Sequence, residues 1–122
     1  MNILLIEDDI TLNGTITDYL RFKGNDIVSL DDGNKAIDTI DEIDFDLYII
    51  DINIPNISGL EIVKYIRQKE TKIPIIIITA SMELENFKIA YQNGCDEYIK
   101  KPFYLEELEI RIDKLLSKKS QK

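Results

Sequence analysis

Acidic, hydroxyl and lysine side chains follow four of the five apolar segments that we expect to form β-strands. Glu7 and Asp8 follow the first segment, Asp51 follows the third and Thr79 follows the fourth. Lys101 comes after the fifth segment, immediately before a proline. Carboxylates, a hydroxyl and an ammonium group can together bind a divalent cation and handle a phosphoryl group. The chain contains no histidine, so its chemistry has to rest on these groups and on the backbone.

Three carboxylates gathered in one small site repel one another unless a cation or protons neutralise them. Glu7, Asp8 and Asp51 offer only oxygen ligands, without the sulfur or imidazole that softer metals prefer. A few carboxylates, completed by waters and a phosphate oxygen, suit octahedral Mg²⁺ better than the larger coordination shell of calcium. The backbone carbonyl of Asn53 is a further candidate ligand. We therefore predict a magnesium site formed by these four residues.

Asp51 is the candidate nucleophile, because a carboxylate can form an acyl phosphate that water later removes. Its position after a rigid apolar strand would aim its oxygens at an incoming phosphorus. Lys101 would place a positive charge, and Thr79 a hydroxyl donor, against the transferred group. Taken singly, each residue has a simpler interpretation: Asp8 or Asp9 is a helix N-cap, and a lone lysine is usually a surface residue. Only the joint pattern favours a site.

Five apolar runs alternate with amphipathic segments, which predicts a (βα)5 order for the whole chain. The expected strands are residues 2–6, 26–30, 46–50, 74–78 and 96–99. Helical spacing of apolar residues appears after each strand, as at Ala36, Ile37, Ile40 and Ile43, and the fourth helix is expected to stop at Asn93-Gly94. Runs of consecutive apolar residues favour strands buried on both faces. We predict a three-layer, doubly wound, flavodoxin-like α/β fold with a five-stranded parallel sheet, whose ligands bind at the carboxyl ends of the strands.

Length and composition indicate one globular domain, residues 1–117, followed by a polar tail or linker at 118–122. The chain has 122 residues and a formal net charge of −8, which opposes direct binding to nucleic acid. The sequence contains neither a membrane-spanning apolar stretch nor a secretory leader, so we expect a cytoplasmic protein. Cys95, the single cysteine, is expected to be a buried core residue without chemistry.

The chain resembles the response-regulator receiver family across essentially its whole length, in the spacing and residues of four stretches: IEDD, IIDINIPNISGLE, IIIITAS and GCDEYIKKPF. The resemblance implies a two-component signalling switch that a sensor histidine kinase phosphorylates on Asp51. It assigns Glu7 and Asp8 to Mg²⁺ as the acidic pair, and Asn53 as the carbonyl ligand. It also implies a hydroxyl role for Thr79.

The same resemblance implies a cis peptide bond between Lys101 and Pro102, which places the lysine side chain in the site. Tyr98 stands where the family has an aromatic residue that turns inward when Thr79 moves toward the phosphoryl group. The pattern is closest to receivers that precede a winged-helix DNA-binding domain, which implies regulation of transcription. Such receivers form homodimers on activation through the fourth helix, fifth strand and fifth helix, where this chain carries Asp96, Glu97, Glu107 and Arg111. Phe87 departs from that pattern, since a basic residue is expected to face Glu107.

Three other functions remain open on the sequence alone. A phosphohydrolase with an aspartate nucleophile usually needs a second aspartate two residues later, where this chain has Asn53. A flavin or nucleotide carrier needs a small-residue phosphate loop after the first strand, where this chain has acidic residues. A receiver-like interaction module that is never phosphorylated is the third. We expect no enzyme activity beyond the chain's own phosphorylation and dephosphorylation.

Overall fold

The chain folds as five parallel strands that alternate with five helices, in a computed structural model that describes residues 1–69 and 72–120. The sheet has the strand order β2-β1-β3-β4-β5, and every pair of neighbouring strands is parallel. This arrangement confirms the predicted doubly wound fold. The elements are β1 (Asn2–Ile6), α1 (Ile10–Phe22), β2 (Asp26–Leu30), α2 (Gly33–Glu42), β3 (Leu47–Asp51), α3 (Gly59–Lys69), β4 (Ile75–Thr79), α4 (Leu84–Asn93), β5 (Glu97–Lys100) and α5 (Leu105–Ser120).

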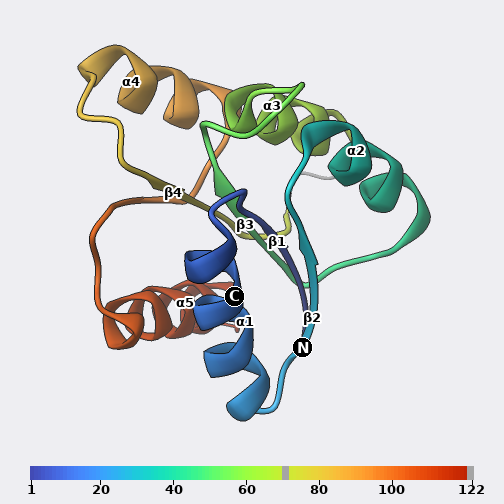
Figure 1. The fold of residues 1–122 in the computed structure, drawn as a ribbon, viewed down its shortest axis with the longest axis vertical. Helices are drawn as coiled ribbons and strands as arrows, with labels where there is room; N and C mark the ends of the chain where they lie inside the picture. The colour runs from blue at the N-terminus through green and yellow to red at the C-terminus, as the bar shows by residue number, and fades with distance from the viewer. Residues whose placement is uncertain (70–71, 121–122) are drawn as a thin grey trace.

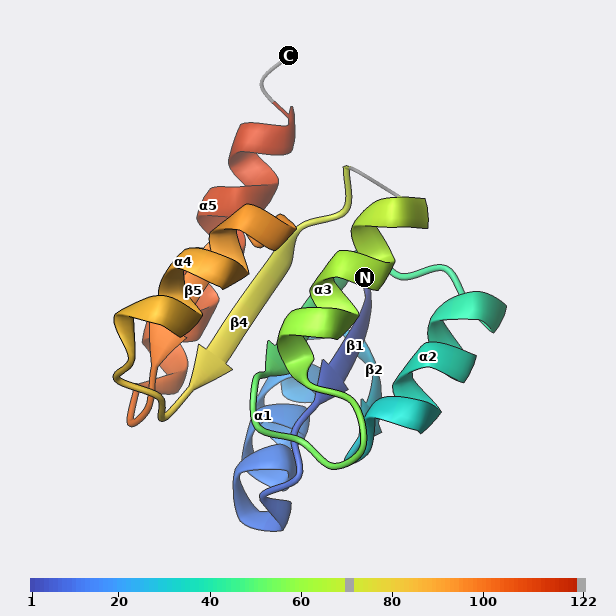
Figure 2. The same cartoon turned by 90° about the horizontal axis from the view of Figure 1, so that it is seen from above.

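The sheet is covered on both faces, with α2, α3 and α4 on one side and α1 and α5 on the other (Figure 1). Seen from above, α2, α3 and α4 lie in a row across the sheet (Figure 2). Successive strand residues point to opposite faces, so Ile75 and Ile77 pack in one core while Ile76 and Ile78 pack in the other. Both cores are apolar, which explains why the central strands are apolar at consecutive positions.

Three strands lie one residue later than predicted at both ends, so the sequence assignment was wrong there: Asp51, Thr79 and Lys100 are the last residues of their strands and do not follow them. Asp46, Pro74 and Asp96 precede β3, β4 and β5. Each makes a single backbone hydrogen bond across the sheet: Asp46 donates to Asn2, Asp96 donates to Ile75, and the Pro74 carbonyl accepts from Tyr48. The apolar pattern located the strands. A residue with one backbone hydrogen bond before a strand, however, does not belong to that strand.

Two helix ends, the start of α1 and the end of α4, follow the expected capping rules, whereas one predicted helical residue lies outside its helix. The side chain of Asp9 accepts a hydrogen bond from the Leu12 backbone at 3.1 Å, so Asp9 is the N-cap of α1 and Asp8 is left free of that role. Gly94 ends α4 with a φ of 113°. The predicted helical position of Ile43 is wrong, because α2 ends at Glu42 and Ile43 is extended.

The carboxyl-terminal helix reaches Ser120, so residues 118–120 of the expected tail are helical, whereas residues 121–122 lie outside the described residues. The domain boundary at residue 117 stays a prediction. No helix in the described part of the chain is both long enough and apolar enough to cross a membrane.

Candidate functional site

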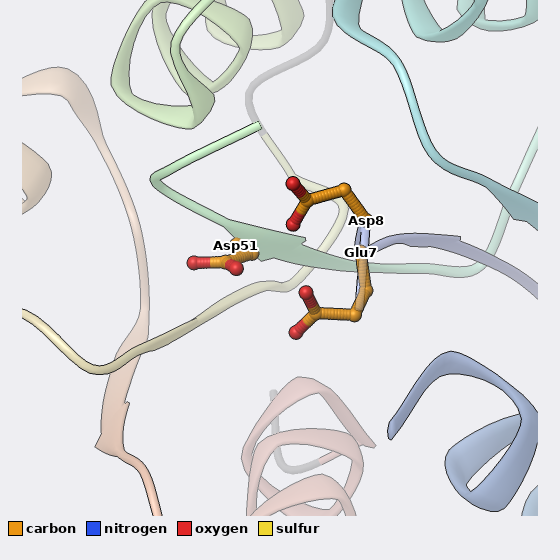
Figure 3. Close-up of side chains that lie close together, drawn as sticks. All are labelled: Glu7, Asp8 and Asp51. Carbon is orange, nitrogen blue, oxygen red and sulfur yellow. The ribbon is translucent and has the colours of Figure 1, made fainter. Parts of the chain in front are cut away.

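The carboxyl ends of β1 and β3 bring the three predicted metal ligands together. These strands are neighbours, with Ile6 paired to Ile50, so the residues that follow them emerge side by side. Glu7, Asp8 and Asp51 each offer a carboxylate oxygen within 4.8 Å of the others. Figure 3 shows their side chains converging beyond the strand ends. The predicted meeting of acidic residues from two separate strands is present in the structure.

Lys101 lies between two of these carboxylates. Its Nζ is 2.6 Å from Oε1 of Glu7 and 2.9 Å from Oδ2 of Asp51. Glu7 is 1% exposed and Asp51 is 4% exposed, whereas Asp8 is exposed. One ammonium group therefore lies against two buried carboxylates, while Asp8 lies exposed at the mouth of the site.

The pKa values of this cluster show how little its negative charge is compensated. Burial raises the pKa of Glu7 to about 7, although Lys101 and the Asp9 backbone N–H act to lower it. Burial alone would lower the pKa of Lys101, but the two carboxylates outweigh burial and raise it. Lys101 is thus held in its charged form, while Glu7 retains its proton up to about neutral pH.

Thr79 lies at the end of β4, adjacent to the strand that carries Asp51. The register pairs Asp51 with Ile78, one residue before Thr79. Thr79 is fully buried, and its Oγ1 accepts a hydrogen bond from the Ser81 backbone at 3.0 Å. Its carbonyl accepts from the Lys101 backbone at 2.8 Å, which joins the two loops that flank the site. The bond between Lys101 and Pro102 is cis, as the resemblance implied.

The loop after β3 starts at the site and is packed tightly against it. The Asn53 backbone N–H donates to Oδ1 of Asp51 at 3.3 Å, and the Asn53 side chain is exposed. A Cβ atom on Gly59 would collide with the Asp51 carbonyl oxygen, so this close approach requires glycine. Asn53 therefore lies next to the carboxylate cluster, directly after two residues, Asp51 and Ile52, whose backbone packs against Gly59.

Tyr98 occupies the middle of β5 and is 8% exposed. Its ring meets that of Phe87 edge-on, with 5.2 Å between the ring centroids, and Phe87 meets Tyr91 in the same way at 5.0 Å. Burial raises the pKa of the Tyr98 hydroxyl, and the Ser81 side chain lowers it. The tyrosine is thus already packed inward, under a partly exposed aromatic residue of α4.

Charged residues near α4, β5 and α5 are paired within the chain. Arg111 lies 2.5 Å from Glu97 and 3.5 Å from Glu107, and Asp96 lies 2.9 Å from Arg67. The residues that the resemblance linked to dimer contacts thus have partners inside one copy.

One supporting residue escaped the sequence analysis. Nδ2 of Asn13 donates to the Glu7 carbonyl at 2.9 Å and reaches the Leu30 carbonyl at 3.4 Å, fixing the end of β1 against α1 and β2. Nothing in its spacing distinguishes Asn13 from any other polar residue of α1, so no sequence signal could have found it.

The carboxylate cluster fits a hard divalent cation. All of its side-chain ligands are oxygens, they lie within 4.8 Å of one another, and the acidic group of Asp8 is exposed and accessible. Glu7, Asp8, Asp51 and the Asn53 carbonyl are the groups that would hold it.

Comparison with known proteins identifies relatives across nearly the whole chain. The profile of the response regulator receiver domain matches residues 3–113. The response regulator ArlR of Staphylococcus epidermidis is 41% identical over 121 residues, which cover 99% of this chain and 55% of that protein. The transcriptional regulatory protein CiaR of Streptococcus pneumoniae is 34% identical over 118 residues, 97% of this chain and 52% of that protein. The chain thus spans about half the length of these relatives.

Solved structures agree with this assignment. A two-component response regulator from Clostridium difficile superposes with a TM-score of 0.91 at 28% identity, covering 96% of both chains. The response regulator TrrA from Thermotoga maritima, solved in complex with Mg²⁺-BeF, has a TM-score of 0.84 at 31% identity, covering 93% of this chain and 97% of that one. Together with the profile match, these likenesses place the chain in the response regulator receiver family.

Proposed function

We propose that this chain is a magnesium-dependent switch that accepts a phosphoryl group on Asp51 from a sensor histidine kinase. The observation that carries the proposal is the Lys101 ammonium group, which lies within 3 Å of both Glu7 and Asp51 at the ends of two neighbouring strands. A cation held beside the Asp51 carboxylate at the ends of these strands meets the needs of phosphoryl transfer.

The transfer exchanges one phosphorus bond for another. The bond between phosphorus and the donor histidine nitrogen breaks as an oxygen of Asp51 bonds to phosphorus, and the nitrogen leaves with the electron pair. Asp51 is fixed by its strand, and the Asn53 N–H orients one carboxylate oxygen, leaving the carboxylate aimed out of the sheet. When bound, Mg²⁺ supplies positive charge beside the phosphoryl oxygens. Lys101 would then exchange its contact with the Asp51 carboxylate for one with those oxygens.

The response to phosphorylation would pass from Thr79 to Tyr98. A phosphoryl group adds charge and three acceptor oxygens, which attract the Thr79 hydroxyl away from the Ser81 backbone. Tyr98 packs against Phe87 of α4, so a change in its packing reaches the surface formed by α4, β5 and α5. We assign the output, regulation of transcription, to that surface, and include homodimer formation on activation and a cytoplasmic location in the same proposal.

The direct test is phosphorylation with a small donor. Incubation with acetyl phosphate and Mg²⁺ is expected to add the mass of one phosphoryl group, and the adduct is expected to map to the peptide that contains Asp51. The Asp51→Asn variant and the wild type with excess chelator are both expected to stay unmodified. Asp46→Asn is a matched control, because it removes a carboxylate at the other end of β3.

Three outcomes would oppose the proposal. An adduct that persists in Asp51→Asn would place the phosphoryl group elsewhere. A wild type that stays unmodified with acetyl phosphate and with a panel of histidine kinases would favour an interaction module that does not use phosphorylation. Continuous release of phosphate from unrelated esters would indicate a hydrolase instead.

A further inference from the structure

The loop between β3 and α3 is hydrogen-bonded to the start of α2. Nδ2 of Asn56 donates a hydrogen bond to Oδ2 of Asp32. The Gly33 backbone N–H donates to the Pro55 carbonyl at 3.0 Å. A Cβ atom on Gly33 would lie 2.6 Å from Cβ of Ile57, so the two segments approach more closely than a side chain would allow. These contacts connect α2 to the loop that begins at Asp51.

The two carboxylate oxygens of Asp32 have separate partners. Oδ1 accepts from the backbone of Asn34 at 2.7 Å and of Lys35 at 3.2 Å, which caps the amino terminus of α2. Oδ2 receives the Asn56 side chain. A helix cap needs only Oδ1, so the second contact serves the loop.

The backbone of Asn56 supports the same contact. Its φ of 73° lies in the left-handed region, which asparagine and aspartate tolerate better than most residues. At the other end of the loop, the Gly59 backbone N–H donates to the Ile52 carbonyl at 2.9 Å. Asn53 therefore lies in a short stretch that is anchored on both sides, at Ile52 and at Asn56.

We propose that Asp32 and Asn56 form a positioning clamp that fixes the Asn53 carbonyl for magnesium, an inference that rests on the proposed function. Mg²⁺ demands near-ideal octahedral geometry, so a ligand on a loosened loop binds it less well. Loss of residues that orient metal ligands typically weakens affinity about 10- to 100-fold. Since one ligand of several is affected, we expect a loss of about tenfold at the low end of that range.

The test is a charge swap across the clamp, with the magnesium dissociation constant measured by calorimetry. Asn56→Asp places two carboxylates face to face and breaks the contact, while aspartate still tolerates the left-handed backbone. In Asp32→Asn combined with Asn56→Asp, an amide again faces a carboxylate and Oδ1 remains to cap α2. We expect about tenfold weaker binding in the single variant and recovery to within about twofold of wild type in the double variant. The negative charge that Asn56→Asp adds would by itself strengthen cation binding. Weaker binding in this variant would therefore come from the displaced ligand and not from the change in charge.

A matched control is the contact between α2 and α3 near the carboxyl end of α2. Asp41 of α2 accepts from the Tyr65 hydroxyl at 2.5 Å and pairs with Lys69, both of α3. Asp41→Asn is expected to lower stability but to leave the magnesium dissociation constant unchanged. Hydrogen exchange of the Gly33 amide in metal-free protein is expected to speed up in Asn56→Asp and to recover in the double variant.

The clamp and the proposed function fail in different ways. Wild type that binds no magnesium would refute the metal site itself. Wild type that binds magnesium, with Asn56→Asp binding equally well or the double variant failing to recover, would overturn the clamp alone.

Discussion

Replacing Glu7 by glutamine is expected to stabilise the metal-free domain, and to do so more strongly as pH rises. Glu7 is 1% exposed, and burial raises its pKa from the ordinary 4.5 to about 7. Each pKa unit corresponds to about 1.4 kcal/mol, so keeping Glu7 charged in the folded state costs about 3 kcal/mol. Glutamine has a similar shape and carries no charge, so the variant avoids this cost.

The sign of the pH dependence follows from proton binding. Between pH 4.5 and about 7 the folded protein keeps a proton on Glu7 that the unfolded chain has lost. The free energy of unfolding of wild type therefore falls through this window as pH rises, whereas that of Glu7→Gln lacks this contribution. Subtracting one curve of unfolding free energy against pH from the other cancels the contributions of the other titrating groups. The advantage of the variant is expected to grow by about 2 to 3 kcal/mol between pH 5 and pH 8.

Urea unfolding in chelator at both pH values measures this difference. Asp8→Asn is the control, since it removes one negative charge from an exposed neighbour and is expected to show a much smaller pH-dependent gain. At pH 8, magnesium at ten times its dissociation constant is expected to stabilise wild type by about 1.4 kcal/mol and Glu7→Gln by less. Parallel pH curves for wild type and Glu7→Gln would refute the reasoning, because they would mean that Glu7 is not an uncompensated buried acid.

Three further substitutions test the framework around the site. Arg67→Ala removes hydrogen bonds to two backbone carbonyls and the ion pair with Asp96. The variant is expected to lower the free energy of unfolding by about 2 kcal/mol in urea titrations. An unchanged midpoint would contradict this. Gly59→Ala is expected to abolish phosphorylation by acetyl phosphate, because its Cβ would collide with the carbonyl of Asp51; full phosphorylation would be the opposing result. Phe87→Ala uncovers the edge of Tyr98 and is expected to speed its ring flipping in NMR spectra, whereas Phe87→Leu, which keeps most of the cover, should change it less.

Much of the fold was predictable because burial on both faces leaves a strong local mark. Four consecutive isoleucines, 75–78, can hardly form anything but a central strand when helices flank them on both sides. Once the strands were placed, the topology rule put Glu7, Asp8 and Asp51 at one edge, and the structure places them there. Apolar spacing could not fix the strand starts, because Asp46 and Asp96 are polar residues that meet the neighbouring strand through one backbone bond and one side-chain bond each.

Contacts between separate loops left no comparable mark in the sequence. Asp32 and Asn56 each look like ordinary turn or cap residues, and only the folded chain shows that they meet. Proline and asparagine are both common in turns, and asparagine tolerates a positive φ, but neither property of Pro55 and Asn56 names a partner 24 residues away. Arg67 of α3 likewise donates hydrogen bonds to the carbonyls of Ile73 and Gly94, two contacts that the sequence pattern does not reveal. Such pairs depend on how the loops are placed by the sheet, which periodicity does not encode.

A crystal soaked in Mn²⁺ tests the central claim most directly, because Mn²⁺ accepts the same oxygen ligands as Mg²⁺ and is located by its anomalous scattering. The account predicts one strong anomalous peak between the carboxylates of Asp8 and Asp51, next to the Asn53 carbonyl, and no peak there in Asp51→Asn. A wild-type crystal with no peak at the ends of β1 and β3, or with its peak at another acidic cluster, would contradict it.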